Sequence, residues 1–383
     1  MTLVFVISVG LLLYTLVGYP LLLLGLWKLR GLRPVPPPVA GMDVDFLIPA
    51  HNEAAVIADK LRNTLSLDNS DGHNVRIIVI SDGSTDGTVS IANSIEDPRI
   101  EVMETPGRSG KLEAMNIAME RMRGDVIIFS DANALLSNGA MTQMMRHYAD
   151  PHVGGVCGQI TIARKKGAAI AEADSLFWRY DQMLKYAESG LGGTVSAQGS
   201  IHSVRRALVD PIPPGVADDF ILSVRAVQKG YRLVFEPKAT TTEMVTEAAR
   251  DEVGRRIRST EMGWRGLMLT RSVMNPFRHG LYAWQMISHK FLRRLMPLFL
   301  LMALLSNLLL IGQGWGWAVL AVGQLTFYSI ALLAYLVPAT RNVPLWGKVM
   351  FFVMSNIAMA LGILAYYRGR ESSIWTPVRE DTT

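Results

Sequence analysis

The chain has 383 residues, a formal net charge of +5, a single cysteine and a hydrophobic content of 50%. One cysteine excludes an internal disulfide framework and fits a reducing compartment such as the cytoplasm. The hydrophobic content is high for a soluble enzyme, and the basic residues gather where apolar segments meet the middle of the chain, so we expect an anionic membrane surface as partner and no nucleic acid.

The N-terminal segment is the first apolar stretch. Residues 2–27 carry no charge and are followed by Lys28 and Arg30. This length and this flank predict a transmembrane helix over residues 1–28, with the domain that follows in the cytoplasm. A cleaved signal peptide is the alternative, but its charges would precede a shorter apolar core. The proline-rich residues 29–42 predict a stiff linker.

Two predicted strands then lead to acidic residues: residues 44–49 precede Glu53, and residues 75–80 precede Asp82. The ends of adjacent parallel strands lie side by side, so both carboxylates are expected to hydrogen-bond a nucleoside. Ordinary turn chemistry is the alternative for Asp82, which precedes a glycine. A dinucleotide-binding Rossmann domain would need a glycine-rich turn after the first strand, and this chain lacks one there.

Lys111 opens the next predicted helix, which runs to about Met122 after Gly107-Arg-Ser-Gly. A cation beside the N–H groups of a helix start suits a phosphate, although a lysine in this turn opposes the helix dipole and can simply be solvated.

Asp131 and Asn133 follow a predicted buried strand over residues 126–130. Ligands of open α/β sheets bind at the carboxyl ends of strands, and hard divalent cations such as Mg²⁺ prefer oxygen ligands together with a substrate phosphate. The pair therefore predicts a metal and diphosphate site. The alternative is a helix N-cap, since Asp and Asn often begin the next helix.

Aromatic and acidic residues mark the second half of the domain. Trp178, in a predicted helix over residues 171–188, can stack on a sugar ring or anchor the chain at a membrane interface. Asp218 and Asp219 begin a predicted helix that ends near Lys229. Only one of two neighbours can cap a helix, so the other is free to act as a base.

Arginines recur on one face of a further predicted helix over residues 247–270. Arg255, Arg258 and Arg265 have three- and four-residue spacings, so their charges repel unless an anion is present. A diphosphate and the anionic membrane surface fit equally well.

The C-terminal part is predicted to return to the membrane. We expect an interfacial helix over residues 273–294, three transmembrane helices within residues 295–367, and a tail over residues 368–383. Four crossings place the C-terminus outside, whereas the arginines of the tail favour the cytoplasm.

These motifs together resemble the membrane-bound family 2 inverting glycosyltransferases, which include hyaluronan, chitin, cellulose and poly-N-acetylglucosamine synthases. The motifs are Ile48-Pro-Ala-His-Asn-Glu53, Ser81-Asp-Gly-Ser-Thr-Asp-Gly87, Gly110-Lys111 with Asn116, Asp131-Ala-Asn133 and Ala217-Asp-Asp219. The resemblance implies an α/β GT-A fold over residues 43–272, Rossmann-like with a mostly parallel sheet and flanked by the transmembrane helices. It also implies that Glu53 and Asp82 hold base and ribose and that Asp219 is the base.

The chain departs from the family pattern at two motifs. Asn133 stands in place of the second metal-binding aspartate. Arg255-Arg-Ile-Arg-Ser259 stands in place of Gln-x-x-Arg-Trp, so Arg258 is kept while Ser259 replaces a tryptophan that lies by the acceptor in the family. Trp264 is a candidate substitute. Asn133 removes a negative charge, which predicts weaker metal binding or a different preferred ion. Ser259 argues against processive polymer synthesis.

The resulting expectation is a multi-pass protein of the plasma (inner) membrane that moves a sugar, first of all from a UDP-sugar, to a lipid or glycan acceptor. Asp131 and Asn133 hold Mg²⁺ or Mn²⁺; the donor is bound by Glu53, Asp82, Lys111, Asp131, Arg255 and Arg258; the acceptor side contains Trp178, Asp218 and Trp264. A processive synthase that extrudes its polymer and a non-catalytic scaffold or sensor are the alternatives. The oligomeric state is left open.

Overall fold

The structure is a computed structural model of residues 1–383, and it describes all of them except 32–33, 35, 164–168, 245–248, 344 and 370–383. The side chains of residues 162–177 and 243–252 are likewise outside the description. The tail arginines Arg370 and Arg379, on which the predicted C-terminal side depends, therefore lie outside the described residues.

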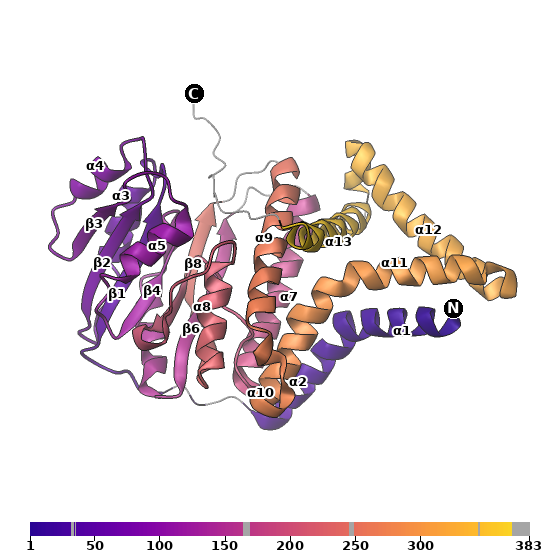
Figure 1. The fold of residues 1–383 in the computed structure, drawn as a ribbon, viewed down its shortest axis with the longest axis horizontal. Coiled ribbons are helices and arrows are strands. Elements are labelled where there is room, and N and C mark those ends of the chain that lie inside the picture. The colour runs from indigo at the N-terminus through magenta and orange to yellow at the C-terminus, as the bar shows by residue number, and fades with distance from the viewer. Residues whose placement is uncertain (32–33, 35, 164–168, 245–248, 344, 370–383) are drawn as a thin grey trace.

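An eight-stranded sheet forms the centre of the domain, in the order β3-β2-β1-β4-β7-β6-β8-β5 (Figure 1). The strands are β1 (Asp43–Ala50), β2 (Asn74–Ser81), β3 (Ile100–Glu104), β4 (Val126–Phe129), β5 (Ala134–Leu136), β6 (Val153–Ala163), β7 (His202–Arg205) and β8 (Arg232–Met244). β1 to β4 are parallel to one another, β4 pairs with β7 antiparallel, and β6 pairs with β8 parallel. The sheet is thus mixed, and its parallel half contains the strands that the sequence predicts.

Helices cover both faces of this sheet because β-branched and aliphatic residues point to both sides of its central strands. On one face pack α3 (Ile57–Leu65), α4 (Thr88–Asn93) and α6 (Ala140–Met145), and on the other α5 (Lys111–Met119) and α8 (Asp218–Gln228). A third apolar cluster joins α8 to α9 (Ala249–Leu269) and to the helices that follow it. The sheet is therefore held between two packed layers.

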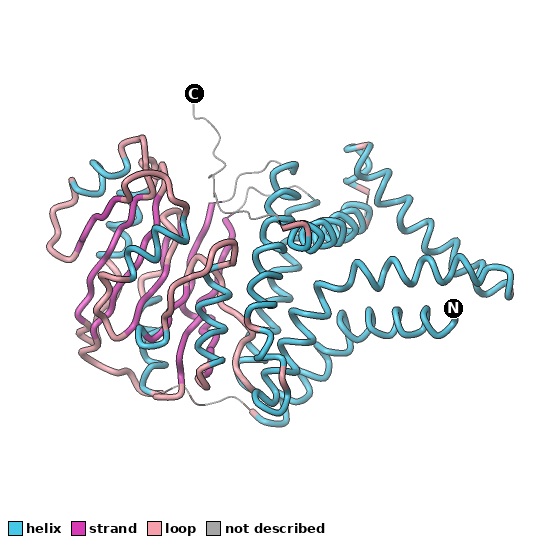
Figure 2. The backbone as a smooth tube through the Cα atoms, in the orientation of Figure 1, coloured by secondary structure: helices cyan, strands magenta, loops and turns pink. Residues whose placement is uncertain are grey.

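The helices α7 (Ala169–Leu191) and α9 lie next to the sheet, and further long helices extend from them away from the sheet (Figures 1 and 2). Within the described residues, four helices are long and apolar enough to cross a membrane: Thr2–Arg30, Pro276–Gln313, Trp315–Leu336 and Trp346–Tyr367. We refer to these four as the membrane helices.

The first of these is built from α1 (Thr2–Leu13), a π-turn (Tyr14–Gly18) and α2 (Tyr19–Arg30), while the last two are α12 and α13. The second consists of α10 (Pro276–Gln285), a π-helical stretch (Met286–Leu292) and α11 (Arg293–Leu310). The predicted interfacial helix is therefore continuous with the first late span, and within α10 the residue Gly280 has non-helical dihedral angles, with a φ of 52°. We call Pro276–Leu292 the interfacial segment.

Candidate active site

Asp131 follows β4 at the carboxyl end of three adjacent parallel strands. β2, β1 and β4 are neighbours, and the loops after them contain Asp82, Glu53 and Asp131. After Asp131 the chain enters the short strand β5 at Ala134, not a helix. The alternative, that Asp131 or Asn133 is a helix N-cap, is therefore wrong.

Lys111 connects Asp131 to the start of α8. Its Nζ atom lies 2.9 Å from Asp131 Oδ1 and 3.0 Å from Asp218 Oδ2. Burial lowers the pKa of Lys111, but the two carboxylates outweigh burial and raise this pKa above its ordinary value. Lys111 is therefore a fixed positive charge between two acids that are far apart in the sequence.

Asp219 borders the same space as Asp131. A methyl group on Gly199 would lie 3.8 Å from Asp131 Oδ2 and 3.9 Å from Asp219 Oδ2, so this glycine leaves the space between the carboxylates open. The N-cap of α8 is Ala217, so neither aspartate is the N-cap residue. Burial and the charge of Asp218 raise the pKa of Asp219 to about 6. Such a carboxyl group can accept a proton near neutral pH.

Asp82 organises the loop that precedes α5. Its carboxylate accepts the N–H groups of Ser109 at 2.7 Å and Gly110 at 2.9 Å. The next residue, Gly83, has a φ of +57°, and a Cβ atom there would lie 2.6 Å from the backbone nitrogen of Arg108. Only glycine permits this close approach of the two loops. Asp82 thereby fixes the residues that lead directly into the start of α5.

Glu53 lies in the adjoining loop and is almost fully buried. Its N–H group donates to Thr88 Oγ1 at 2.8 Å, and the ring Nδ1 of His51 lies 2.6 Å from the carbonyl oxygen of Asp82. The loops after β1 and β2 thus hold one another, and Glu53 and Asp82 lie at the same end of the sheet.

The arginines Arg255 and Arg258 lie on α9, where the first is exposed and the second is half-buried. Burial, and then the charge of Arg255, lower the pKa of Arg258. The two positive charges repel each other, and a bound anion would relieve this repulsion.

The two tryptophans considered for the acceptor side have different surroundings. Trp178 is half-buried on α7. Trp264 is only 3% exposed and stacks on Phe291 of the interfacial segment, with ring centroids 5.7 Å apart. In this arrangement Trp264 packs in the cluster that joins α8, α9 and the interfacial segment, and it presents no open face to a sugar.

Lys60 is a buried cation beneath the Asp131 loop that the sequence analysis missed. It is fully buried on α3, and its Nζ atom donates to Ser130 Oγ and to the carbonyl oxygen of Ala134, both at 2.6 Å. Burial lowers its pKa to about 7. The sequence does indicate that Lys60 is buried, because this lysine falls between Ile57 and Leu61 on the apolar face of an amphipathic helix.

His202 and Gln198 are buried polar side chains to which the sequence assigned no role. His202 stacks on Phe129 with ring centroids 4.8 Å apart, and burial lowers its pKa to about 4. Within the described part of the chain, neither ring nitrogen of His202 and neither amide atom of Gln198 has a hydrogen-bond partner. Buried polar atoms of this kind require an explanation, and a bound ligand is one.

The oxygen atoms near Asp131 fit a divalent cation in part. Asp131 Oδ2 faces the space beside Gly199, and the amide of Asn133 is exposed. Among the described residues there is no group of three or more His, Cys, Asp or Glu side chains that could hold a metal. Mg²⁺ in nucleotide sites takes one or two protein oxygens and completes its shell with phosphate and water. The residues therefore fit a metal that arrives with a diphosphate.

Sequence comparison places this geometry in a known class. Residues 45–212 match the family described as Glycosyl transferase family 2. The chain therefore carries a glycosyltransferase family 2 domain, and its architecture is the GT-A glycosyltransferase fold.

Individual relatives agree with this class. An N-acetylglucosaminyltransferase of Rhizobium sp. (strain N33) is 23% identical over 242 residues, which cover 59% of this chain and 54% of the relative. A poly-beta-1,6-N-acetyl-D-glucosamine synthase of Staphylococcus aureus is 24% identical over 249 residues, 62% of this chain and 59% of the relative. The matched segment thus spans little more than half the length of these curated relatives.

A solved structure resembles nearly the whole chain. It is a mannosyltransferase from Pyrobaculum calidifontis in complex with GDP-Man and Mn²⁺, with a TM-score of 0.69 and 23% sequence identity. The alignment covers 96% of this chain and 100% of that structure, so the arrangement of domain and long helices recurs there.

Proposed function

We propose that this chain is a membrane-embedded inverting glycosyltransferase that moves a sugar from a nucleotide sugar to a membrane-associated glycan or lipid. One observation carries the proposal: the carboxylates of Asp131 and Asp219 border the same space beside Gly199, and Lys111 lies between Asp131 and Asp218. A pyrophosphate leaving group and an acceptor hydroxyl both need to reach such a space. The N-acetylglucosaminyltransferase relatives support a UDP-linked N-acetylhexosamine as the first donor to test.

The reaction is a single displacement at the anomeric carbon. Asp219 takes the proton of the acceptor hydroxyl, the acceptor oxygen bonds to the anomeric carbon, and the bond from that carbon to the diphosphate oxygen breaks. An α-linked donor thereby gives a β-linked product. Lys111 and Arg258 neutralise the charge that develops on the diphosphate, which is the largest stabilising contribution expected for an oxocarbenium-like transition state.

The donor is held at the carboxyl ends of the parallel strands. Glu53 and Asp82 bind the base and ribose, and Arg255 assists at the diphosphate. When bound, a Mg²⁺ or Mn²⁺ ion held by Asp131 and Asn133 supplies further neutralisation of the leaving group. Asn133 contributes no charge, so we expect a weaker metal site than two aspartates would make.

We expect the acceptor to come from the membrane side of the domain and to contact Asp218 and Trp178. We propose that the catalytic domain lies in the cytoplasm. Lys28 and Arg30 end the first membrane helix and Arg293 and Arg294 begin α11, and this distribution of positive charge supports the orientation. The protein is then a multi-pass protein of the plasma membrane whose acceptor is presented by the lipid layer.

The substitution Asp219→Asn tests the proposal. Loss of the base should lower turnover about 10³-fold, since general base catalysis typically contributes 10²- to 10⁴-fold. The dissociation constant for the UDP-sugar, measured by calorimetry, should stay within about threefold of wild type. Asp210→Asn, which removes a half-exposed carboxylate paired with Lys229, is the matched control. Near-normal transfer by D219N with normal donor binding would exclude Asp219 as the base.

A processive polymer synthase is the second candidate, and the Staphylococcus aureus relative favours it. Ser259, in place of the family's tryptophan, favours transfer of one or a few sugars. Size analysis of products made from a labelled donor separates the two: short products support single transfer, and long chains support a synthase. A wild-type protein that neither transfers nor hydrolyses any nucleotide sugar would support the non-catalytic scaffold.

A further inference from the structure

The segment that connects α7 to β7, residues 192–201, is tied to the interfacial segment by buried contacts. The hydroxyl of Tyr282 donates to the carbonyl oxygen of Val195 at 2.8 Å. Gln285 donates to the carbonyl oxygen of Glu188 at 3.2 Å, and the carboxylate of Glu188 accepts the N–H group of Val195 at 3.3 Å. Tyr282, Gln285, Glu188 and Val195 are all buried. Because these hydrogen bonds are shielded from water, the loss of one costs more free energy than the loss of a hydrogen bond at the surface.

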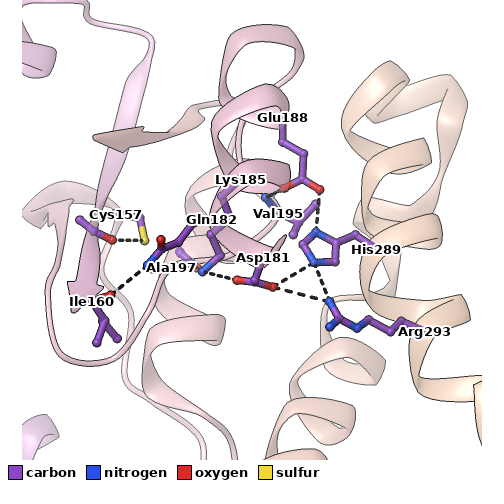
Figure 3. Close-up of polar contacts among 12 residues, drawn as sticks. Cys157, Ile160, Asp181, Gln182, Lys185, Glu188, Val195, Ala197, His289 and Arg293 are labelled. Carbon is purple, nitrogen blue, oxygen red and sulfur yellow. Dashed lines mark hydrogen bonds and ion pairs between the residues drawn. The ribbon is translucent and has the colours of Figure 1, made fainter. Parts of the chain in front are cut away.

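Glu188 is the junction of this network (Figure 3). Its carboxylate is fully buried at the end of α7, where it accepts the hydroxyl of Tyr19 at 2.6 Å and faces Nδ1 of His289 at 2.7 Å. Tyr19 begins α2, and His289 lies in the interfacial segment. One carboxylate therefore joins two membrane helices to the end of α7 and, through Val195, to the segment that follows.

A second carboxylate, about two turns earlier on α7, strengthens the same attachment. Asp181 lies 3.2 Å from Nε2 of His289, 3.4 Å from Nζ of Lys185 and 3.6 Å from Nη1 of Arg293 (Figure 3). Burial raises the pKa of Asp181, but Lys185 and the hydrogen bond from His289 outweigh it and hold this pKa well below its ordinary value. Asp181 therefore stays ionised, and the side of α7 that faces the membrane helices is held by charged groups that are costly to separate.

The other end of the segment is the wall of the active site. The N–H group of Ala197 donates to Ser223 Oγ at 3.1 Å, one turn of α8 after Asp219. Gly199, two residues further, borders the carboxylates of Asp131 and Asp219. A shift of the chain at Val195 is thus carried along a short, buried stretch to the space in which transfer takes place.

We propose that Glu188 is a positioning residue, through which Tyr19 and the interfacial segment set the place of Gly199 relative to Asp219. The membrane helices are then part of the catalytic unit as well as its anchor. This inference rests on the proposed glycosyltransferase function. It predicts that the network affects the chemical step more than donor binding, because the donor loops after β1 and β2 have no part in it and because a misplacement of about 1 Å can cost about 10²-fold in rate.

The test compares Glu188→Ala, Glu188→Gln and Tyr19→Phe in the full-length protein in lipid nanodiscs. We expect E188A to lower kcat about 10²-fold, E188Q to recover most of that loss because it keeps the shape and some hydrogen bonds, and Y19F to lower kcat about tenfold. The dissociation constant for the UDP-sugar, measured by calorimetry, and the apparent melting temperature should change little in Y19F and E188Q.

Tyr14→Phe is the matched control. The hydroxyl of Tyr14 lies in the same membrane helix, 2.7 Å from Ser288 Oγ and 2.9 Å from Trp284 Nε1, so it joins membrane helices to each other. Its loss should leave kcat within twofold. Unchanged kcat in E188A and Y19F, equal losses in Y14F and Y19F, or a fall in donor affinity parallel to the fall in kcat would each overturn the positioning role. Absence of transfer by the wild-type protein with every nucleotide sugar would instead remove the proposed function and the inference with it.

Discussion

In the proposed mechanism, Asp219 is the base and its ionisation decides the chemistry. Burial and the adjacent Asp218 raise its pKa to about 6, while Lys111 and Lys185 act in the opposite direction. A base must be deprotonated to act, so the group works only above this pKa. The same balance has a cost in stability: the folded protein binds a proton that the unfolded chain releases, so this group's contribution to stability falls as the pH rises from about 4 to about 6.

The pH dependence of kcat/KM should therefore show a rising limb with an apparent pKa near 6, followed by a plateau. Asp218→Asn removes the neighbouring charge that raises the pKa of Asp219, so this limb should move to lower pH. Initial rates with subsaturating donor between pH 4.5 and 8 measure both profiles. A limb that stays in place in D218N would show that Asp218 does not set the ionisation of the base.

The buried Lys60 leads to a second prediction, which concerns how the stability of the folded protein depends on pH. Its pKa in the folded protein, about 7, lies below that of an unfolded lysine, so folding becomes more favourable as the pH rises from about 7 to about 10. Lys60→Met removes this contribution, and it also removes the bonds to Ser130 and Ala134. The melting temperature of wild type minus that of K60M should be larger at pH 9 than at pH 6. Lys229→Met, at a partly exposed lysine, is the matched control.

At the scale of elements, α13 and α9 make a close helix contact. A Cβ atom at Gly362 would lie 2.7 Å from the carbonyl oxygen of Ile257 and 2.7 Å from Cβ of Thr260. A backbone oxygen cannot move aside as the end of a side chain can, so glycine permits this approach of the last membrane helix to the helix that carries Arg255 and Arg258.

Gly362→Val should therefore separate α13 from α9 at a cost of about 1 to 3 kcal/mol, as overpacking usually does. The melting temperature in detergent should fall, and transfer should fall with it if the arginines of α9 bind the diphosphate. Gly323→Val in α12 is the control, because a Cβ there meets no atom within 4 Å. Equal stability of G362V and G323V would contradict the close contact.

Sequence patterns predicted the elements that have strong periodicity or caps. The strands that lead to Glu53, Asp82 and Asp131, and the helices that begin near Lys111 and Asp218, lie within a few residues of their predicted places. The strands β3 and β5 to β8 were missed: β3, β5 and β7 are short, and β6 and β8 lack a clear alternation. Lys60 and Glu188 were missed as well, since a buried ion's role depends on partners from distant segments.

For the whole molecule, the arrangement of the four membrane helices makes a topological prediction. With the domain in the cytoplasm, the turn between α11 and α12 faces outside and the turn between α12 and α13 faces inside. Gln313 and Ala339 are exposed in these two turns, and the single native thiol, Cys157, is buried. In a C157S background, Q313C should react with a membrane-impermeant maleimide in intact cells, and A339C only after permeabilisation. The reverse pattern would invert the assignment of sides.

The bridge that Lys111 makes between Asp131 and Asp218 bears on the order in which substrates arrive. An ammonium group on a short tether competes with free ions at an effective concentration on the order of millimolar or above. A bare divalent cation therefore gains little by approaching Asp131, whereas a cation chelated by a pyrophosphate brings the anion that can draw the lysine away. Lys111 is thus the counter-ion of Asp131 in this structure, and for the proposed donor and metal we expect binding together, not one after the other.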